Sequence, residues 1–131
     1  MSRTFALLAA TTLMFGSTVA VAGAKPAPSP CKYELSPPSV VNVSGTDVVT
    51  ATVSPRDCDG AVVIQSVACI KMQGSDGGGQ CVSNNGILPA QVFFQPFRPG
   101  TTYISTGRGC AVKGNPPQKF CQEKGPISGS L

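Results

Sequence analysis

The residues that could carry chemistry are few, and the one close pair of carboxylates is Asp57 and Asp59, on either side of Cys58. Paired carboxylates can act as general acid and base when a cleft holds them apart at the right distance. Here they belong to the run Pro55-Arg56-Asp57-Cys58-Asp59-Gly60. That run predicts a tight turn, because Pro presets φ, Asp accepts local backbone hydrogen bonds and Gly tolerates positive φ. The favoured role of both aspartates is therefore turn formation.

Other catalytic groups are missing. The chain has no His, so the Ser-His and Cys-His pairs that activate a nucleophile cannot be built from its side chains. Calcium is the alternative ligand for Asp57 and Asp59, with Asp76 as a third oxygen donor, but the EF-hand spacing with its distal Glu is absent. We therefore predict no enzyme activity, no cofactor and no metal site.

The cysteines form the strongest pattern in the sequence. They are Cys31, Cys58, Cys69, Cys81, Cys110 and Cys121. An even number in an exported chain, with no Cys-x-x-Cys pair, predicts three disulfides rather than a zinc or redox site. The spacing leaves several pairings open. The favoured set joins Cys69 to Cys81 across a Gly-rich loop, Cys110 to Cys121 across 114–117, and Cys31 to Cys58.

The start of the chain predicts export. Arg3 precedes an apolar stretch from Phe5 to Phe15, and small residues around Ala22 offer a cleavage site, as in a secretory signal peptide. The stretch is shorter than the about 20 residues of a membrane span. We expect a signal peptide over 1–24, a Pro-rich leader over 25–32, and a single β-sandwich domain over 33–131 with a loop-like C-terminal tail.

The elements that must position these residues are strands. Val49, Ala51 and Val53 alternate with Thr50 and Thr52, which predicts a half-buried strand over 47–53. A second strand, over 61–70, has apolar residues on both faces, which suits a central strand covered on both sides. The turn at 55–60 would join the two as a hairpin, and a second sheet must cover it.

The flanking segments complete this picture. Residues 33–43 predict an edge strand, because Pro37 and Pro38 cannot donate to a ladder. Residues 80–83 predict a short strand, and 87–97 a core stretch in which Phe93 and Phe94 must face opposite ways. The tail from 107 to 131 is expected to hold a disulfide-closed loop, a short strand around 118–122 and a frayed end. Asn42-Val43-Ser44 matches the N-glycosylation pattern.

One corner of the chain resembles a known fold. Phe97-Arg98-Pro99-Gly100-Thr101-Thr102-Tyr103 resembles the turn into the penultimate strand of fibronectin type III and related immunoglobulin-like sandwiches. The stretch from Leu35 to Val53 is similar to the first two strands of bacterial immunoglobulin-like domains. The resemblance implies that the Tyr103 hydroxyl bonds back to the corner backbone. Without Trp, and with Cys110 seven residues after Tyr103, the chain departs from antibody-type domains.

The expected fold class is therefore all-β, a disulfide-stabilised immunoglobulin-like antiparallel β-sandwich. Small disulfide-bonded sandwiches of actinobacterial chromoprotein type are also similar in size and in their hairpin-spanning cysteines. No binding residue carries over from that similarity.

Charge is uneven along the chain. From residue 98 onward Glu123 is the only acidic residue against five basic ones, and these define a possible patch for an anionic partner. The five are Arg98, Arg108, Lys113, Lys119 and Lys124. With no Trp and only two Tyr, nothing indicates a stacking platform for nucleic acid.

We therefore expect a secreted, monomeric, non-enzymatic binding domain that acts through the loops at one end of the sandwich and through the basic C-terminal third. Its partner would be a protein or an anionic envelope component. Two alternatives stay open. One is a small-molecule carrier with an apolar cleft lined by Phe93, Phe94 or Phe97, and the other is a structural protein of the cell envelope.

Overall fold

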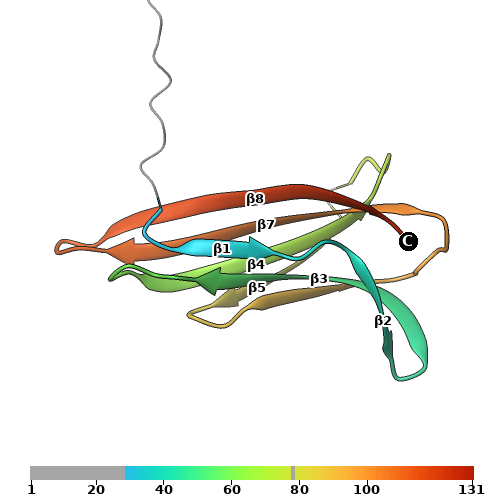
Figure 1. The fold of residues 1–131 in the computed structure, drawn as a ribbon, viewed down its shortest axis with the longest axis horizontal. Coiled ribbons are helices and arrows are strands. Elements are labelled where there is room, and N and C mark those ends of the chain that lie inside the picture. The colour runs from blue at the N-terminus through green and yellow to red at the C-terminus, as the bar shows by residue number, and fades with distance from the viewer. Residues whose placement is uncertain (1–28, 78) are drawn as a thin grey trace, which may run out of the picture.

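Two antiparallel sheets pack face to face in the computed structural model, which describes residues 29–77 and 79–131 (Figure 1). The predicted signal peptide and residues 25–28 lie outside the described residues. The strands are β1 (Lys32–Leu35), β2 (Ser39–Val43), β3 (Thr46–Arg56), β4 (Val62–Met72), β5 (Gln80–Asn85), β6 (Ala90–Phe94), β7 (Thr102–Lys113) and β8 (Gln118–Ser130). No helix occurs in these two ranges.

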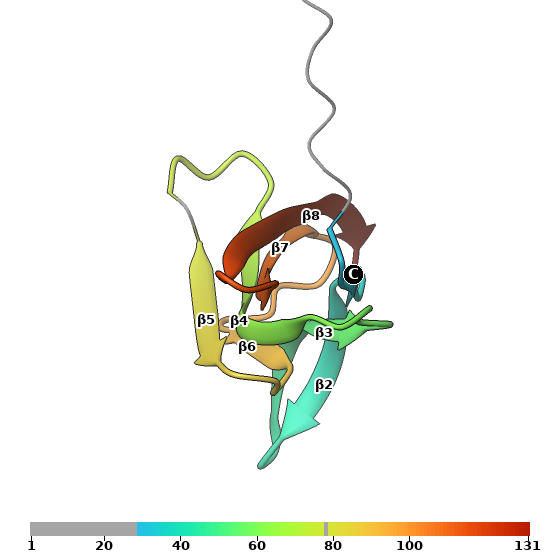
Figure 2. The ribbon, with the colours of Figure 1, turned by 90° about the vertical axis from the view of Figure 1, so that its left-hand side faces the viewer.

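The strand order defines the class of fold. In the first sheet, β1 and β2 both pair with β3, and β6 pairs with β3 as well. The second sheet has the order β5-β4-β7-β8. Figure 2 shows the two layers end on, with β8, β7 and β5 in one and β3 and β2 in the other. This arrangement confirms the expected disulfide-stabilised, immunoglobulin-like β-sandwich.

The predicted hairpin between 47–53 and 61–70 is wrong in its pairing. Both segments form strands, but β3 belongs to the first sheet and β4 to the second, so the turn between them crosses from one layer to the other. The apolar alternation of β3 explains its place, because Val49, Ala51 and Val53 are fully buried in the core between the sheets. The turn signal was correct, since a tight turn fits a crossover as well as a hairpin.

Strand β4 is not buried on both sides. Its ladder with β7 shifts register between Val63 and Gln65, which reverses the phase of the side chains that follow. Val63 is buried before the shift, and Ser66, Ala68 and Ile70 are buried after it, whereas Val67 is only half-buried on the outer face. The apolar residues on both faces therefore reflect a bulge, not a doubly covered strand.

The edge strand predicted over 33–43 exists, but Pro37 and Pro38 divide it into β1 and β2. Ser36 joins the two halves to the sheet at this break. Its backbone N–H donates to the Thr52 carbonyl at 2.9 Å, and its hydroxyl accepts from the Thr52 N–H at 2.8 Å. The Ser36 hydroxyl thus takes the place of a backbone carbonyl acceptor at the point where Pro37 and Pro38 interrupt the ladder.

The strand expected around 118–122 is present, but it continues to Ser130, so the expectation of a loop-like tail with a frayed end is wrong. β8 runs for 13 residues along β7, and the end of the chain is held, because the Leu131 N–H donates to the Thr101 carbonyl at 3.1 Å. The glycines that suggested a loop have a packing role. Gly107 and Gly109 lie on the inner face of β7, where a Cβ would overlap Val53 and the ring of Tyr33 respectively.

The three disulfides join the favoured pairs. Cys69–Cys81 links directly opposite residues of β4 and β5, and Cys110–Cys121 does the same for β7 and β8. Cys31–Cys58 ties the residue before β1 to the β3–β4 turn. No cysteine in the described part of the chain is free. Two bridges therefore lock hairpins of the second sheet, and the third locks the first strand to a crossover.

Tyr103 makes the corner contact that the resemblance implied. Its side chain is fully buried, and its hydroxyl accepts a hydrogen bond from the Arg98 N–H at 2.9 Å and donates to the Pro96 carbonyl at 3.3 Å. Phe94 packs against the same ring in an edge-on arrangement, with 5.8 Å between ring centroids. Tyr103 thus fixes the β6–β7 connection to the core.

Substituting Tyr103→Phe should lower the free energy of unfolding by about 1–2 kcal/mol, because the part-buried hydrogen bonds to the Arg98 N–H and the Pro96 carbonyl are lost. Denaturant unfolding of the oxidised protein measures the change. An effect within the error of the measurement would show that the corner contact does not stabilise the fold.

Tyr33→Phe is the matched control. The Tyr33 hydroxyl is buried with no hydrogen-bond partner among the described residues, so its loss should leave stability unchanged or raise it slightly. Burial also raises the pKa of Tyr33 above its ordinary 10.0. The folded state therefore keeps this proton where the unfolded state loses it, and stability should fall as pH rises above about 10. Tyr33→Phe should remove that part of the alkaline loss.

Candidate functional site

Three connections and the start of the domain meet at one end of the sandwich. They are the β3–β4 turn, the β5–β6 turn, the β7–β8 turn and the segment at Cys31, all at the left of Figure 1. Two contacts hold the β3–β4 turn to the segment at Cys31. They are the Cys31–Cys58 disulfide and a hydrogen bond of 2.9 Å from the Asp59 N–H to the Pro30 carbonyl. We call this region the loop end.

The β5–β6 turn holds two large apolar side chains out of the core. The Gly86 N–H donates to the Ile64 carbonyl at 2.8 Å, and the Asn84 side-chain amide donates to the Pro89 carbonyl at 2.8 Å. Gly86 has φ +81°, which a residue with a side chain rarely adopts. These contacts close the turn so that Ile87 is 71% exposed and Leu88 62% exposed.

An apolar hollow of about 330 Å³ lies beside this turn. Its apolar lining is Pro55, Ala61, Val62, Val63 and Ile87, and Arg56, Asp57 and Cys58 complete it. Val62 is 59% exposed at its wall, so the three most exposed large apolar side chains of the described residues all belong to the loop end. Scattered single apolar residues are normal on a surface, but a cluster over a hollow indicates a contact site.

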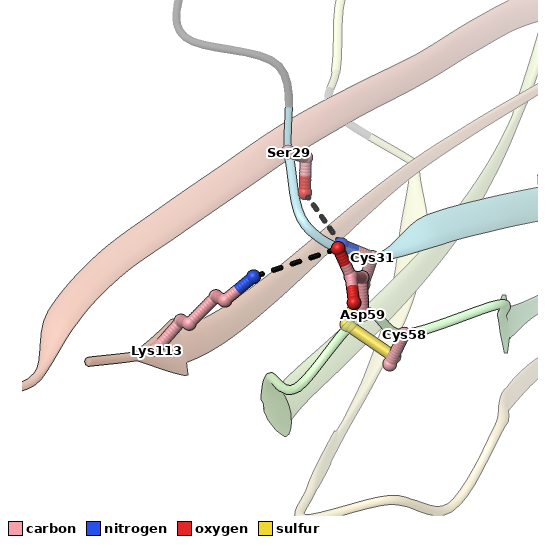
Figure 3. The surroundings of a disulfide bond; sticks show 5 residues. All are labelled: Ser29, Cys31, Cys58, Asp59 and Lys113. Atoms are coloured by element: carbon pink, nitrogen blue, oxygen red, sulfur yellow. Dashed lines mark hydrogen bonds and ion pairs between the residues drawn. A yellow bond between two sulfur atoms is a disulfide. The ribbon is translucent and has the colours of Figure 1, made fainter.

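A second hollow, of about 430 Å³, adjoins the first through Asp57. Its lining comes from three segments and is Ser29, Pro30, Lys32, Asp57, Asp59, Lys113 and Phe120. Figure 3 shows part of it around the Cys31–Cys58 disulfide. Lys113 Nζ lies 3.7 Å from Asp59 Oδ2, and the Cys31 N–H donates to the Ser29 hydroxyl at 3.4 Å. Both signs of charge are therefore present at its walls.

The aspartates of the β3–β4 turn have the surroundings of turn residues. The Asp59 side chain is 95% exposed, and Asp57 has φ +40°, a conformation that Asp tolerates in turns. Asp76 lies beyond the far end of β4, roughly 33 Å along the strand from Asp59, so the three cannot share one calcium ion. In residues 29–77 and 79–131 no group of three or more His, Cys, Asp and Glu is placed to hold a metal ion.

The five basic residues of the expected anionic-partner patch do not come together. Arg98 lies in the β6–β7 connection and Lys113 at the other end of β7, roughly 35 Å away along the strand. Arg108 and Lys119 are on the outer face of the second sheet, whereas Lys124 pairs with Gly107 and so faces the other way. Arg108 Nε also lies 3.4 Å from Glu123 Oε1.

The three phenylalanines of the carrier alternative do not line one cleft either. Phe94 and Phe97 are half-buried against the core beside Tyr103, whereas Phe93 is 46% exposed on the opposite face, as the strand period required. Of the three phenylalanines, only Phe97 lines a third hollow, whose other lining residues include Thr46, Asp47 and Pro96.

Sequence reasoning missed the apolar residues of the loop end, because it assigned Ile87 and Leu88 to the core stretch 87–97. A signal was present, since Asn84-Asn85-Gly86 predicts a tight turn and Pro89 prevents the ladder from reaching back to it. Two large apolar residues between a turn and a proline have no strand to bury them.

A scan against protein-family models, a search of curated proteins and a search of solved structures each found no match to the chain. In the described part of the chain, no helix has the length and apolar character needed to cross a membrane. The fold and the loop end are therefore the observations from which a function must be argued.

Proposed function

We propose that this chain is a secreted binding domain without an enzyme active site, and that it takes a protein partner at the loop end. The observation that carries the proposal is the group of exposed apolar side chains, Val62, Ile87 and Leu88, beside an apolar hollow of about 330 Å³. Loops on a rigid sandwich commonly carry binding residues, and their tips here are fixed by hydrogen bonds and a disulfide.

The charges around the hollows favour a protein over an anionic polymer. Arg56 pairs with Glu34 at 3.0 Å and Lys113 with Asp59 at 3.7 Å, so positive and negative groups alternate. A protein interface typically has an apolar centre and a polar rim of mixed charge. The three disulfides are compatible with an oxidising environment, which supports a role outside the cell.

The test is a double substitution, Ile87→Asp with Leu88→Asp. Both side chains are exposed, so stability should change by no more than about 0.5 kcal/mol per site. Partner binding should fall by at least about tenfold, because apolar anchors at the centre of an interface carry most of its affinity. Retention of proteins from the culture medium of the producing cells, on immobilised chain, measures the effect.

The matched control adds the same two charges elsewhere, as Ser128→Asp with Ser130→Asp on β8, at the opposite end of the sandwich. Equal retention by the wild type and both variants would contradict the proposal. Loss of retention in the β8 variant alone would place the contact site at the wrong end and would also contradict it.

A further inference from the structure

Strand β2 is an open edge of the first sheet. It pairs with β3 through five residues, Ser39 to Val43, and its close contacts with other strands of the described chain are almost all with β3. Its side chains contribute nothing to the core cluster. A row of backbone N–H and C=O groups on its far side is therefore left for another strand.

The other edges carry features that oppose strand addition. β8 has Lys119, Glu123 and Lys124, followed by Pro126, which has no N–H. β1 has Lys32 and Glu34. β6 has β5 close beside it across the corner between the sheets. β5 has a disulfide to β4 at its second residue and ends in two asparagines, which are poor strand formers.

Strand β2 has no charged residue, no proline and no disulfide, and one asparagine, Asn42. Its sequence, Ser-Val-Val-Asn-Val, is rich in a β-branched residue and has neither charge nor proline. The nearest carboxylate, that of Asp47, accepts a hydrogen bond from the Asn42 side-chain amide at 3.1 Å. The chain has a formal net charge of +4, to which Arg3 of the expected signal peptide contributes, so two copies carry net charge of the same sign. At β2 they would meet without like charges in contact.

The outer face of the sheet next to β2 is apolar as well. Val41 lies directly opposite Val48, and Phe93 lies opposite Thr50, on the face that points away from the core. Val48 is buried on that face, and Val43 and Phe93 are each 46% exposed. This strip ends abruptly at the free edge of β2, where nothing in the described chain continues it.

We propose that β2 pairs antiparallel with β2 of a second copy of this chain, across a two-fold axis at Val41. The first sheets of the two copies then form one continuous sheet. Val41 faces Val41 of the other copy, and Val43 faces Ser39 of the other copy, so the apolar strip runs on across the pair. Backbone hydrogen bonds supply the affinity, as in other strand additions.

The dimer is weak. Two five-residue strands bury less surface than the about 1,000 Å² that a stable interface needs. Reversible association in the range between about 10 µM and 1 mM is expected. The proposal differs from the monomer expected from the sequence, in which an unpaired strand edge is not visible.

The pairing has a consequence that rests on the proposed function. Because the strands are antiparallel across the axis, the two loop ends point in opposite directions from the dimer. A target that presents several copies of the partner can then engage both ends, which raises the apparent affinity without new contacts. Self-association is measured without any partner, so its failure would leave the proposed function untouched.

Sedimentation velocity of the oxidised mature chain, from about 10 µM to 1 mM, tests the pairing. The wild type should shift from monomer to dimer over this range. Val41→Lys and Val41→Glu should each stay monomeric, because they place like charges opposite one another across the axis. An equimolar mixture of the two should dimerise again. Ile87→Lys, which adds the same charge at the loop end, should dimerise as the wild type does.

Two further measurements keep the test decisive. Near-ultraviolet circular dichroism checks that each variant is folded. If Val41→Lys does not fold, Val43→Lys is used in its place, because the Val43 side chain is 46% exposed. Val43→Lys should weaken the dimer at least about tenfold. The proposal is overturned by a wild type that is monomeric at about 1 mM. Equal dimerisation of Val41→Lys and wild type, or a charge-swapped mixture that stays monomeric, overturns it as well.

Discussion

Adding one methyl group at Gly109 should destabilise the sandwich by about 3 kcal/mol or more. Gly109 lies on the inner face of β7, and the ring of Tyr33, from the other sheet, packs directly over it, so that a Cβ would overlap three ring atoms. Tyr33 is 3% exposed and cannot move aside, because its strand pairs with β3 and follows the Cys31 disulfide. Overpacking in such a site costs about 1–3 kcal/mol and sometimes more.

Denaturant unfolding of Gly109→Ala measures this cost, and Gly77→Ala is the control. Gly77 lies in the exposed β4–β5 loop, where the nearest atom to an added Cβ is 3.9 Å away, so its change should stay within about 0.5 kcal/mol. Tyr33→Ala should relieve the overlap, so Gly109→Ala should cost at least about 1 kcal/mol less in that background. If the costs of Gly109→Ala and Tyr33→Ala are simply additive in the double variant, the contact between Gly109 and Tyr33 is contradicted.

Removing the Cys31–Cys58 disulfide should cost about 3.5 kcal/mol, more than removing either of the others. It closes a separation of 27 residues, against 12 for Cys69–Cys81 and 11 for Cys110–Cys121, and the entropy of the unfolded chain rises with the loop that is released. By the same relation the two shorter bridges contribute about 2.8 kcal/mol each. Cys31 is also fully buried, so Cys31→Ala loses packing as well.

Unfolding of the three double Cys→Ala variants gives the comparison directly. The Cys31/Cys58 variant should also release the segment before β1 from the β3–β4 turn, and hydrogen exchange at the Asp59 N–H, which bonds to Pro30, should accelerate. An unchanged exchange rate, with a cost no larger than that of the hairpin bridges, would mean that the turn holds its position without the disulfide.

Several features of the fold could be predicted because they depend on short-range patterns. The alternation of Val49, Ala51 and Val53 with threonines predicted a half-buried strand. Pro37 and Pro38 predicted an edge. The cysteines on either side of two turns predicted their partners, since residues opposite one another across a hairpin are close. The corner at Tyr103 depended on a local motif, and the hydroxyl contacts confirm it.

The errors arose where a pattern has two physical outcomes. The turn at 55–60 fits a hairpin and a crossover equally well, so it could not place β3 and β4 in different sheets. A single register shift at Val63 reversed the faces of β4. Gly107 and Gly109 suggested a loop, because the sequence does not show that Val53 and Tyr33 pack over them.

The candidate site depended on distance in three dimensions, which composition does not give. The basic residues after 98 are close in sequence, but strand alternation and strand length spread them over two faces and two ends. The loop end is built from four segments between residues 29 and 120, and its apolar members are separated by β4 and β5. Of its residues, sequence reasoning singled out Asp57, Asp59, Lys113 and the cysteines.

The most direct test of the proposed binding role is site-specific photo-crosslinking in the medium of the producing cells. A photoreactive side chain at Leu88, which is 62% exposed at the loop end, is compared with one at Ser128 on the outer face of β8. We predict a discrete adduct with another protein from position 88 and none from position 128. An adduct from position 128 with none from position 88 would contradict a partner site at the loop end.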